Sequence, residues 1–197
     1  DVPKHNPIDI SQYILDLMDG KTPKILKPWY RGFNGVIEPT SIGSYITRGR
    51  VEYINDSTLR ITELPIGSWT EKYVEFLNKI SVERGKETAK NFIRTYTDNS
   101  TETQVDITVK INPVNINKWH NKFGKDGVSE LENRLKLTSS IGTSNMHMFD
   151  ENCKITKFYN VESIIEKWFT IRKEIYIKRR EYLLNQLKKE LDIIKFK

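Results

Sequence analysis

Three segments of the chain place their apolar residues at the spacing of an amphipathic helix. In residues 8–18 and again in residues 70–80, apolar side chains recur three and four positions apart. Ser68 or Thr70 is the candidate N-cap of the second segment. Residues 161–197 contain no Gly or Pro and carry an apolar stripe at the same spacing, so we expect one helix there, about 50 Å long.

Short runs of β-branched and aromatic residues, separated by turn signals, predict strands elsewhere. Asn55-Asp56 lies between two such runs and indicates a hairpin. Residues 112–127 are polar and suit a short helix within a loop, whereas residues 129–137 favour neither structure. The predicted strands fall in residues 35–65, at residues 92–93 and 105–109, and in residues 143–149 and 155–159.

This order of elements predicts an α+β fold. We expect a mixed strand and helix body over residues 1–160 and a long projecting helix over residues 161–197. The helix is long for a small domain, so we expect it to leave the body toward a partner helix.

Composition and charge narrow the classes of protein to which the chain can belong. The 197 residues are 37% hydrophobic and 29% charged, without an apolar run of the length that a membrane span needs. Cys153 is the only cysteine, which excludes an internal disulfide and suggests a reducing, intracellular compartment. The chain starts without Met or a secretory segment, which suggests a fragment of a longer protein.

The net charge of +6 lies entirely in residues 154–197, which hold 12 Lys/Arg and 6 Asp/Glu. A basic segment of this kind attracts a polyanion such as DNA, although a solvated helix face has the same composition.

The sequence lacks the usual signatures of catalysis. It has no Gly-rich phosphate loop, no Asp-x-Asp pair for Mg²⁺ and no Gly-x-Ser-x-Gly turn. His147 and Cys153 lie six residues apart around an expected turn, but isolated residues of these types are more often surface or packed side chains. We therefore predict no catalytic, cofactor-binding or metal-binding residue in this chain and favour a binding or structural role.

Basic residues beside aromatic residues and Gly suggest contacts with nucleic acid, because Lys and Arg bind phosphates and Gly lets a backbone approach closely. An alternating strand over residues 45–54 would put Arg48 and Arg50 on one face, either a face that binds DNA or simply a solvent-exposed one. The candidate DNA-binding residues are Lys4, Lys24, Lys27, Arg31, Arg48 and Arg50.

Five segments, in order, resemble the part of eukaryotic-type (type IIA) DNA topoisomerase II that follows its catalytic winged-helix domain. The most specific is Ile-Thr-Glu-Leu-Pro-Ile-Gly-Ser-Trp-Thr at residues 61–70. The others are His-Asn-Pro at residues 5–7 with Leu-Met-Asp-Gly at 17–20, Lys-Pro-Trp-Tyr-Arg-Gly-Phe-Asn-Gly at 27–35, residues 136–138 with 143–150, and residues 171–183.

The resemblance implies a homodimeric enzyme that cleaves one duplex with a pair of tyrosines, passes a second duplex through the break and reseals the first. ATP and Mg²⁺ are expected for the intact enzyme and are held outside this chain, as is the nucleophilic tyrosine, because no Arg-Tyr pair occurs here. The matching region is the tower, which supports the arms of the cleaved duplex and continues into a coiled coil toward the exit gate. Residues 112–130 match that region poorly.

Two other hypotheses remain at this point: a stand-alone, non-catalytic DNA-binding or scaffold module, and an unrelated small enzyme. The resemblance implies double-stranded DNA as the partner and no membrane. It also implies a nuclear location if the source is a eukaryotic cell, or a site of viral replication if the source is a large virus.

Overall fold

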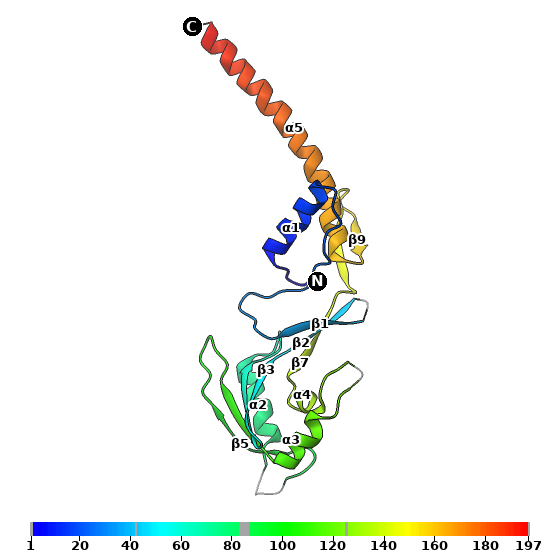
Figure 1. Cartoon of the computed structure of the whole chain (residues 1–197). Helices are drawn as coiled ribbons and strands as arrows, with labels where there is room; N and C mark the ends of the chain where they lie inside the picture. Colours follow the sequence, from blue (N-terminus) through cyan, green and yellow to red (C-terminus); the bar gives the residue numbers. More distant parts are fainter. Residues whose placement is uncertain (1, 42, 83–86, 125, 197) are drawn as a thin grey trace. The chain divides into compact units, whose positions relative to one another are not determined.

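The computed structural model describes residues 2–41, 43–82, 87–124 and 126–196. The expected α+β class is confirmed. In chain order the elements are α1 (Pro7–Met18), β1 (Val36–Ser41), β2 (Ser44–Arg48), β3 (Arg50–Asn55), β4 (Thr58–Glu63), α2 (Thr70–Ile80), β5 (Ile93–Asp98), β6 (Ile107–Ile111), α3 (Pro113–His120), α4 (Glu130–Arg134), β7 (Thr138–Gly142), β8 (Met146–Phe149), β9 (Ile155–Phe158) and α5 (Val161–Lys195), as labelled in part in Figure 1.

Contacts divide the chain into two compact units. One unit is discontinuous and combines residues 1–27 with residues 143–197, while residues 28–142 form the other. This division differs from the expected boundary between residues 160 and 161, because α1 and the β8–β9 hairpin belong to the same unit as α5. The assignment of a DNA-holding part and a coiled-coil part is a functional division, and it stays a prediction.

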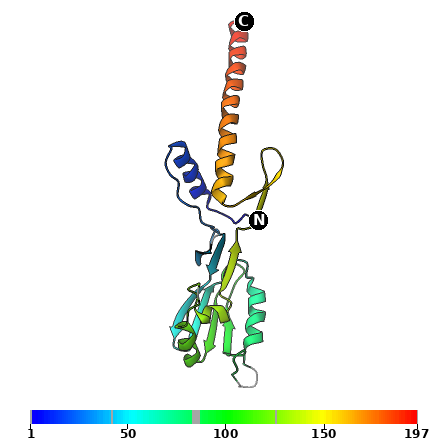
Figure 2. The ribbon, with the colours of Figure 1, turned by 90° about the vertical axis from the view of Figure 1, so that its right-hand side faces the viewer.

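The core of the unit formed by residues 28–142 lies on one face of an antiparallel sheet with strand order β3-β4-β6-β5. Leu59 and Ile61 of β4 pair with Val109 and Ile107 of β6, and all four side chains are buried. Side chains from α2, α3 and α4 complete this core, and Figure 2 shows α2 beside the sheet. Along β6 the more buried and the more exposed positions alternate, which confirms the predicted strand with one solvent-exposed face.

Charged side chains lie on the solvent-exposed face of the same sheet. Arg60 donates two hydrogen bonds to Asp106, at 2.7 and 2.8 Å. These bonds hold the pKa of the Asp106 carboxyl below its ordinary value. The predicted hairpin is also confirmed, since β3 and β4 pair antiparallel around the turn at residues 56–57.

Two local predictions were wrong. Neither Ser68 nor Thr70 caps α2: the N-cap is Trp69, which has no capping side chain, and Ser68 belongs to a turn closed by its N–H on the carbonyl of Pro65. The expected strand over residues 45–54 is broken at Gly49, between β2 and β3. β2 pairs with β1 and β7 in a three-stranded sheet, whereas β3 belongs to the four-stranded sheet.

The discontinuous unit is built around α5. Tyr13 and Leu26 pack with Ile165, and the Tyr13 hydroxyl donates a hydrogen bond of 2.9 Å to Glu166. Beyond Ile171 every described side chain of the helix is exposed. The predicted single helix is therefore confirmed, and most of its apolar stripe has no cover among the described residues.

Candidate nucleic-acid interface

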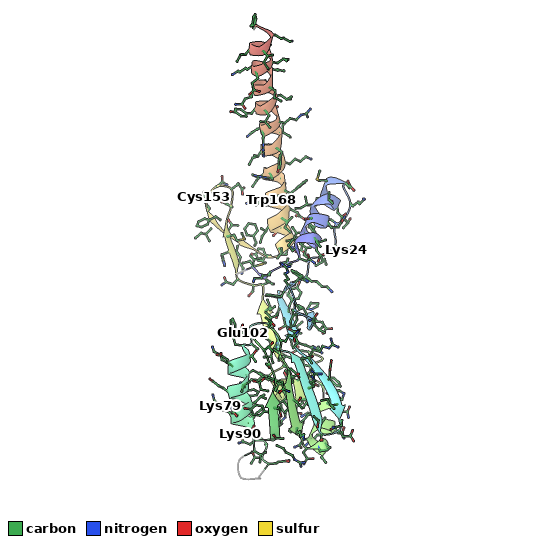
Figure 3. The ribbon with its side chains drawn as sticks, turned by 90° about the vertical axis from the view of Figure 1, so that its left-hand side faces the viewer. Lys24, Lys79, Lys90, Glu102, Cys153 and Trp168 are labelled. Atoms are coloured by element: carbon green, nitrogen blue, oxygen red, sulfur yellow. The ribbon has the colours of Figure 1, made fainter. Side chains whose placement is uncertain are left out.

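The predicted DNA-binding residues are divided between the two compact units. Lys4, Lys24 and Lys27 lie in the discontinuous unit, on the segments that precede and follow α1, and all three are exposed. Figure 3 labels Lys24. Arg31 is exposed in the other unit. None of these four side chains forms an ion pair with any described residue, so each has a charge free to meet a phosphate.

The side chain of Arg48 is bound by other residues of the same compact unit. Its side chain is only 20% exposed, and its Nη2 lies 3.1 Å from a carboxylate oxygen of Glu38. The guanidinium also donates to the backbone carbonyls of Gly127, at 3.2 Å, and Asp126, at 3.3 Å. These bonds fix the loop before α4 against the end of β2, so Arg48 has a structural role whatever it contacts in addition.

Arg50 is more available than Arg48. Its side chain is 58% exposed and lies 3.4 Å from Glu52, its neighbour on the same strand. An exposed pair of this kind is weak and exchanges readily for a phosphate. Gly49 brings the two arginines to one cavity of about 340 Å³ although they belong to different sheets.

A second group of basic residues was missed from the sequence. Lys72 of α2 and Lys136, which follows α4, line one pocket of about 210 Å³ together with Trp69 and Phe76. The Lys136 ammonium lies 4.4 Å from the centre of the Phe76 ring. Both ammonium groups lack a carboxylate partner among the described residues. The only hint in the sequence is the proximity of Lys72 to residues 61–70, because Lys136 is brought there by tertiary packing.

Trp69 lies between this basic pocket and an acidic groove, and Lys72 lines both. The indole is 74% exposed. On its other side a wide groove is lined by Glu71 and Glu75 of α2 and by Asp98 and Glu102 beside β5; Figure 3 shows Glu102 near the start of α2. Four carboxylates against the single ammonium of Lys72 make this groove negative, which is unfavourable for a phosphate.

An apolar groove lies between α1 and α5 in the discontinuous unit. Ile14 and Met18 form one side and Trp168, Phe169 and Tyr176 the other, around a volume of about 370 Å³. Met18 is 67% exposed and Trp168 is 51% exposed, which is unusual for large apolar side chains that lie together.

The remaining candidates for chemistry are dispersed. His147 bonds to the side chain of Asn145 at 2.8 Å, and Cys153 is exposed in the turn between β8 and β9. Within the described part of the chain no three His, Cys, Asp or Glu side chains are grouped so as to hold a metal ion. Of the helices described, none combines the length and the apolarity that crossing a membrane requires.

Comparison with known proteins gives one consistent family. The family model of the A subunits of DNA gyrase and topoisomerase IV matches residues 1–197. DNA topoisomerase 2 of Pisum sativum is 37% identical over 195 residues, which cover 98% of this chain and 13% of the relative. The mitochondrial DNA topoisomerase 2 of Dictyostelium discoideum is 37% identical over 202 residues, covering 99% of this chain and 14% of that protein.

A solved structure shares the fold as well as the sequence. The DNA-binding, cleavage and re-ligation domain of Plasmodium falciparum topoisomerase II superimposes with a TM-score of 0.83 at 32% identity. The match covers 96% of this chain and 24% of the other. The chain therefore corresponds to a small part of each protein that it resembles.

Proposed function

Because the chain belongs to the DNA gyrase/topoisomerase IV family, we propose that it is one part of an ATP-dependent type II DNA topoisomerase, the part that supports the cleaved duplex. The observation that carries this proposal is the match of nearly the whole chain to the DNA-binding, cleavage and re-ligation domain of the Plasmodium falciparum enzyme. The catalytic tyrosine, ATP and Mg²⁺ belong to other parts of the longer, homodimeric protein.

We further propose that duplex DNA is held through its phosphates, without recognition of bases. The unpaired cations support this: Lys4, Lys24, Lys27 and Arg31 lie on loops, where phosphate contacts are easily made. Arg50 adds an exposed guanidinium. We add Lys72 and Lys136 to the predicted contacts, and we propose for Arg48 a contact that accompanies its structural role.

In this proposal α5 is the first strand of the coiled coil that leads to the exit gate. Its uncovered apolar residues, among them Leu184, Leu187 and Leu191, follow the spacing that a partner helix requires. The groove between α1 and α5 is continuous with this stripe at Tyr176. For a eukaryotic source we propose a nuclear location, and for a viral source the site of viral replication.

The test is the affinity of the 197-residue chain for a duplex of about 30 base pairs, measured against salt concentration. A chain that holds a few phosphates gives weak, sequence-independent binding with a slope of about 0.9 per phosphate on a logarithmic plot. We expect the double variant Lys72→Glu/Lys136→Glu to lower that slope by about 2. Lys79→Glu, on the exposed far end of α2, is the control with no expected effect on the slope.

Two results would contradict these proposals in different ways. An unchanged slope for the double variant would remove Lys72 and Lys136 from the interface and leave the other contacts standing. Binding that depends strongly on base sequence, with little dependence on salt, would contradict the phosphate-holding role itself and favour a stand-alone DNA-binding module.

A further inference from the structure

The four-stranded sheet of the unit formed by residues 28–142 has one edge that no described strand covers along its full length. β5 is the last strand, beyond β6, and Figure 1 shows it at the margin of the unit. Ser81 and Val82 run along the start of β5, where the N–H of Val82 donates to the carbonyl of Ile93 at 2.8 Å. Past Arg94 this side of the strand has no backbone partner among the described residues.

The register identifies the backbone groups that remain open on β5. The N–H of Asn99 donates to the carbonyl of Asp106 at 2.8 Å, so Asn99 directs its backbone groups toward β6. Neighbouring residues of a strand direct these groups to opposite sides, so Asp98 and Tyr96 direct theirs away from β6. An open edge of this kind can bind an extended peptide as an additional strand, through main-chain hydrogen bonds.

A groove beside this edge determines which peptide fits. Its volume is about 1010 Å³, and it lies between the first part of α2 and the end of the β5–β6 hairpin. The charged groups of its lining are the ammonium of Lys72 and the carboxylates of Glu71, Glu75, Asp98 and Glu102. All five residues are exposed, so a peptide can reach them, and none forms an ion pair with any described residue. The groove therefore favours Lys and Arg side chains.

Trp69 adds an aromatic surface to the same groove. Its side chain is 74% exposed and contacts no ring or cation among the described residues. The face of an indole attracts a Lys ammonium or an Arg guanidinium. Val74, which is partly buried, contributes an apolar surface for the methylene groups of a basic side chain. The lining thus offers contacts to the whole length of a Lys or Arg.

We propose that the open edge of β5 and the groove beside it bind an extended peptide rich in Lys and Arg, contributed by a partner protein. The peptide backbone pairs with Tyr96 and Asp98, and its basic side chains meet the carboxylates of α2 and of the hairpin. This interaction is independent of the proposed DNA-supporting function, because the groove is unfavourable for a phosphate. The two share only Lys72, which also lines the basic pocket, and Trp69 beside it.

The experiment is a titration of the ¹⁵N-labelled 197-residue chain, without DNA, with a synthetic peptide of about eight residues in which Lys and Thr alternate. NMR at low salt follows the binding. We expect saturation, shift changes centred on Glu75, Tyr96 and Asp98, and amide exchange at Tyr96 and Asp98 slowed about tenfold. A peptide in which Pro replaces Thr keeps the charge but cannot pair as a strand, and it should bind about tenfold more weakly.

Variants of the chain test the contribution of the groove. Glu71→Gln/Glu75→Gln should weaken binding of the Lys–Thr peptide about fivefold. Glu181→Gln/Glu190→Gln, at exposed positions of α5, changes the net charge equally and should leave the affinity unchanged. Lys72→Glu should strengthen peptide binding about twofold, whereas the same substitution is expected to remove a phosphate contact.

Several outcomes would overturn the proposal. Equal weakening by the two glutamate pairs would mean that net charge alone attracts the peptide. Equal affinity for the Lys–Thr and Lys–Pro peptides, or shift changes that leave Tyr96 and Asp98 unaffected, would exclude strand addition, and an absence of saturation would exclude the site. Because DNA is not present, any of these results leaves the DNA-supporting function standing, and failure of DNA binding leaves this site standing.

Discussion

Gly49 is the residue on which the path of the chain between its two larger sheets depends. A Cβ added there would lie 2.3 Å from the backbone carbonyl oxygen of Glu63, so the strands would have to separate. We expect Gly49→Ala to lower the free energy of unfolding by about 1–3 kcal/mol, measured by urea denaturation. Gly142→Ala is the control: no atom lies within 4 Å of its added Cβ, and its effect should stay within about 0.5 kcal/mol, or be stabilising.

Tyr73 makes a buried side-chain hydrogen bond in the same unit. Its hydroxyl donates to the carbonyl of Leu135 at 2.7 Å, and the residue is 4% exposed. Tyr73→Phe leaves that carbonyl without its donor, so we expect a loss of about 1–2 kcal/mol in the free energy of unfolding. Tyr96→Phe removes a more exposed bond to Asn78 and should cost less than about 0.5 kcal/mol. Equal losses for the two variants would contradict this argument.

Tyr13 makes stability depend on pH in the alkaline range. Burial, followed by the hydrogen bond to Glu166 and the nearby negative charges, raises the pKa of Tyr13 to about 12 from an ordinary value of 10.0. Below pH 10 its contribution to stability is fully present. Above pH 10 the unfolded chain releases the proton first, so the free energy of unfolding falls as the pH rises toward 12.

The check is urea denaturation at several pH values between 9 and 12, for the natural chain and for Tyr13→Phe. The variant should show a shallower decline, because it lacks the titrating hydroxyl. Tyr73, whose pKa burial also raises, remains in both proteins. Parallel declines would mean that Tyr13 titrates alike in the folded and unfolded chains.

At the scale of elements, α5 contains two kinds of apolar residue. Ile165 is buried in the small core with Tyr13 and Leu26, so Ile165→Ala should cost about 2–4 kcal/mol. Leu187 is 60% exposed, and Leu187→Ser should change the stability of the isolated chain by less than about 0.5 kcal/mol. Circular dichroism during urea denaturation measures both. A large cost for Leu187→Ser would show that the stripe is already covered, for example in a dimer of this chain.

Helices α1, α2 and α5 and the β3–β4 hairpin could be predicted because their signals are local, whereas residues 129–137, which contain α4, favoured neither structure. The bounds of α2 follow from apolar spacing alone, and the β3–β4 turn follows from Asn55-Asp56. β7 was missed because residues 138–142 (Thr-Ser-Ser-Ile-Gly) show no alternation; the strand exists through its pairing with distant β2. The break at Gly49 has the same origin, since it reflects the close approach of Glu63 and no local preference.

The candidate interface was predictable only as a list of charges. Sequence reasoning identified Arg48 as a cation but not its pairing with Glu38, which is set by the register of β1 against β2. It missed Lys136, because only tertiary packing brings that residue to Lys72 and Trp69. Only the folded structure shows which basic side chains are paired with a carboxylate and which are not.

At the scale of the whole molecule, the segment that carries the net charge is not the segment that we expect to contact DNA. All of the excess positive charge lies in residues 154–197, yet the described side chains beyond Ile171 are exposed and form a solvated face. We expect Lys178→Gln/Arg179→Gln/Arg180→Gln to change the affinity for a duplex of about 30 base pairs by less than about twofold at physiological salt, where charges farther apart than about 8 Å are screened. A loss as large as that of Lys72→Glu/Lys136→Glu would place α5 against DNA.

The discontinuous unit imposes an order on synthesis. Its first part, residues 1–27, cannot acquire its core until Ile165 has left the ribosome, because residues 28–142 come between. The intervening unit contains its own core and can fold during this interval, which follows the general tendency of domains to fold as they emerge. Its folding also shortens the loop that α1 and α5 must close, which lowers the entropic cost of joining them. We therefore expect residues 28–142 to fold first, and residues 1–27 to pack with residues 143–197 afterwards.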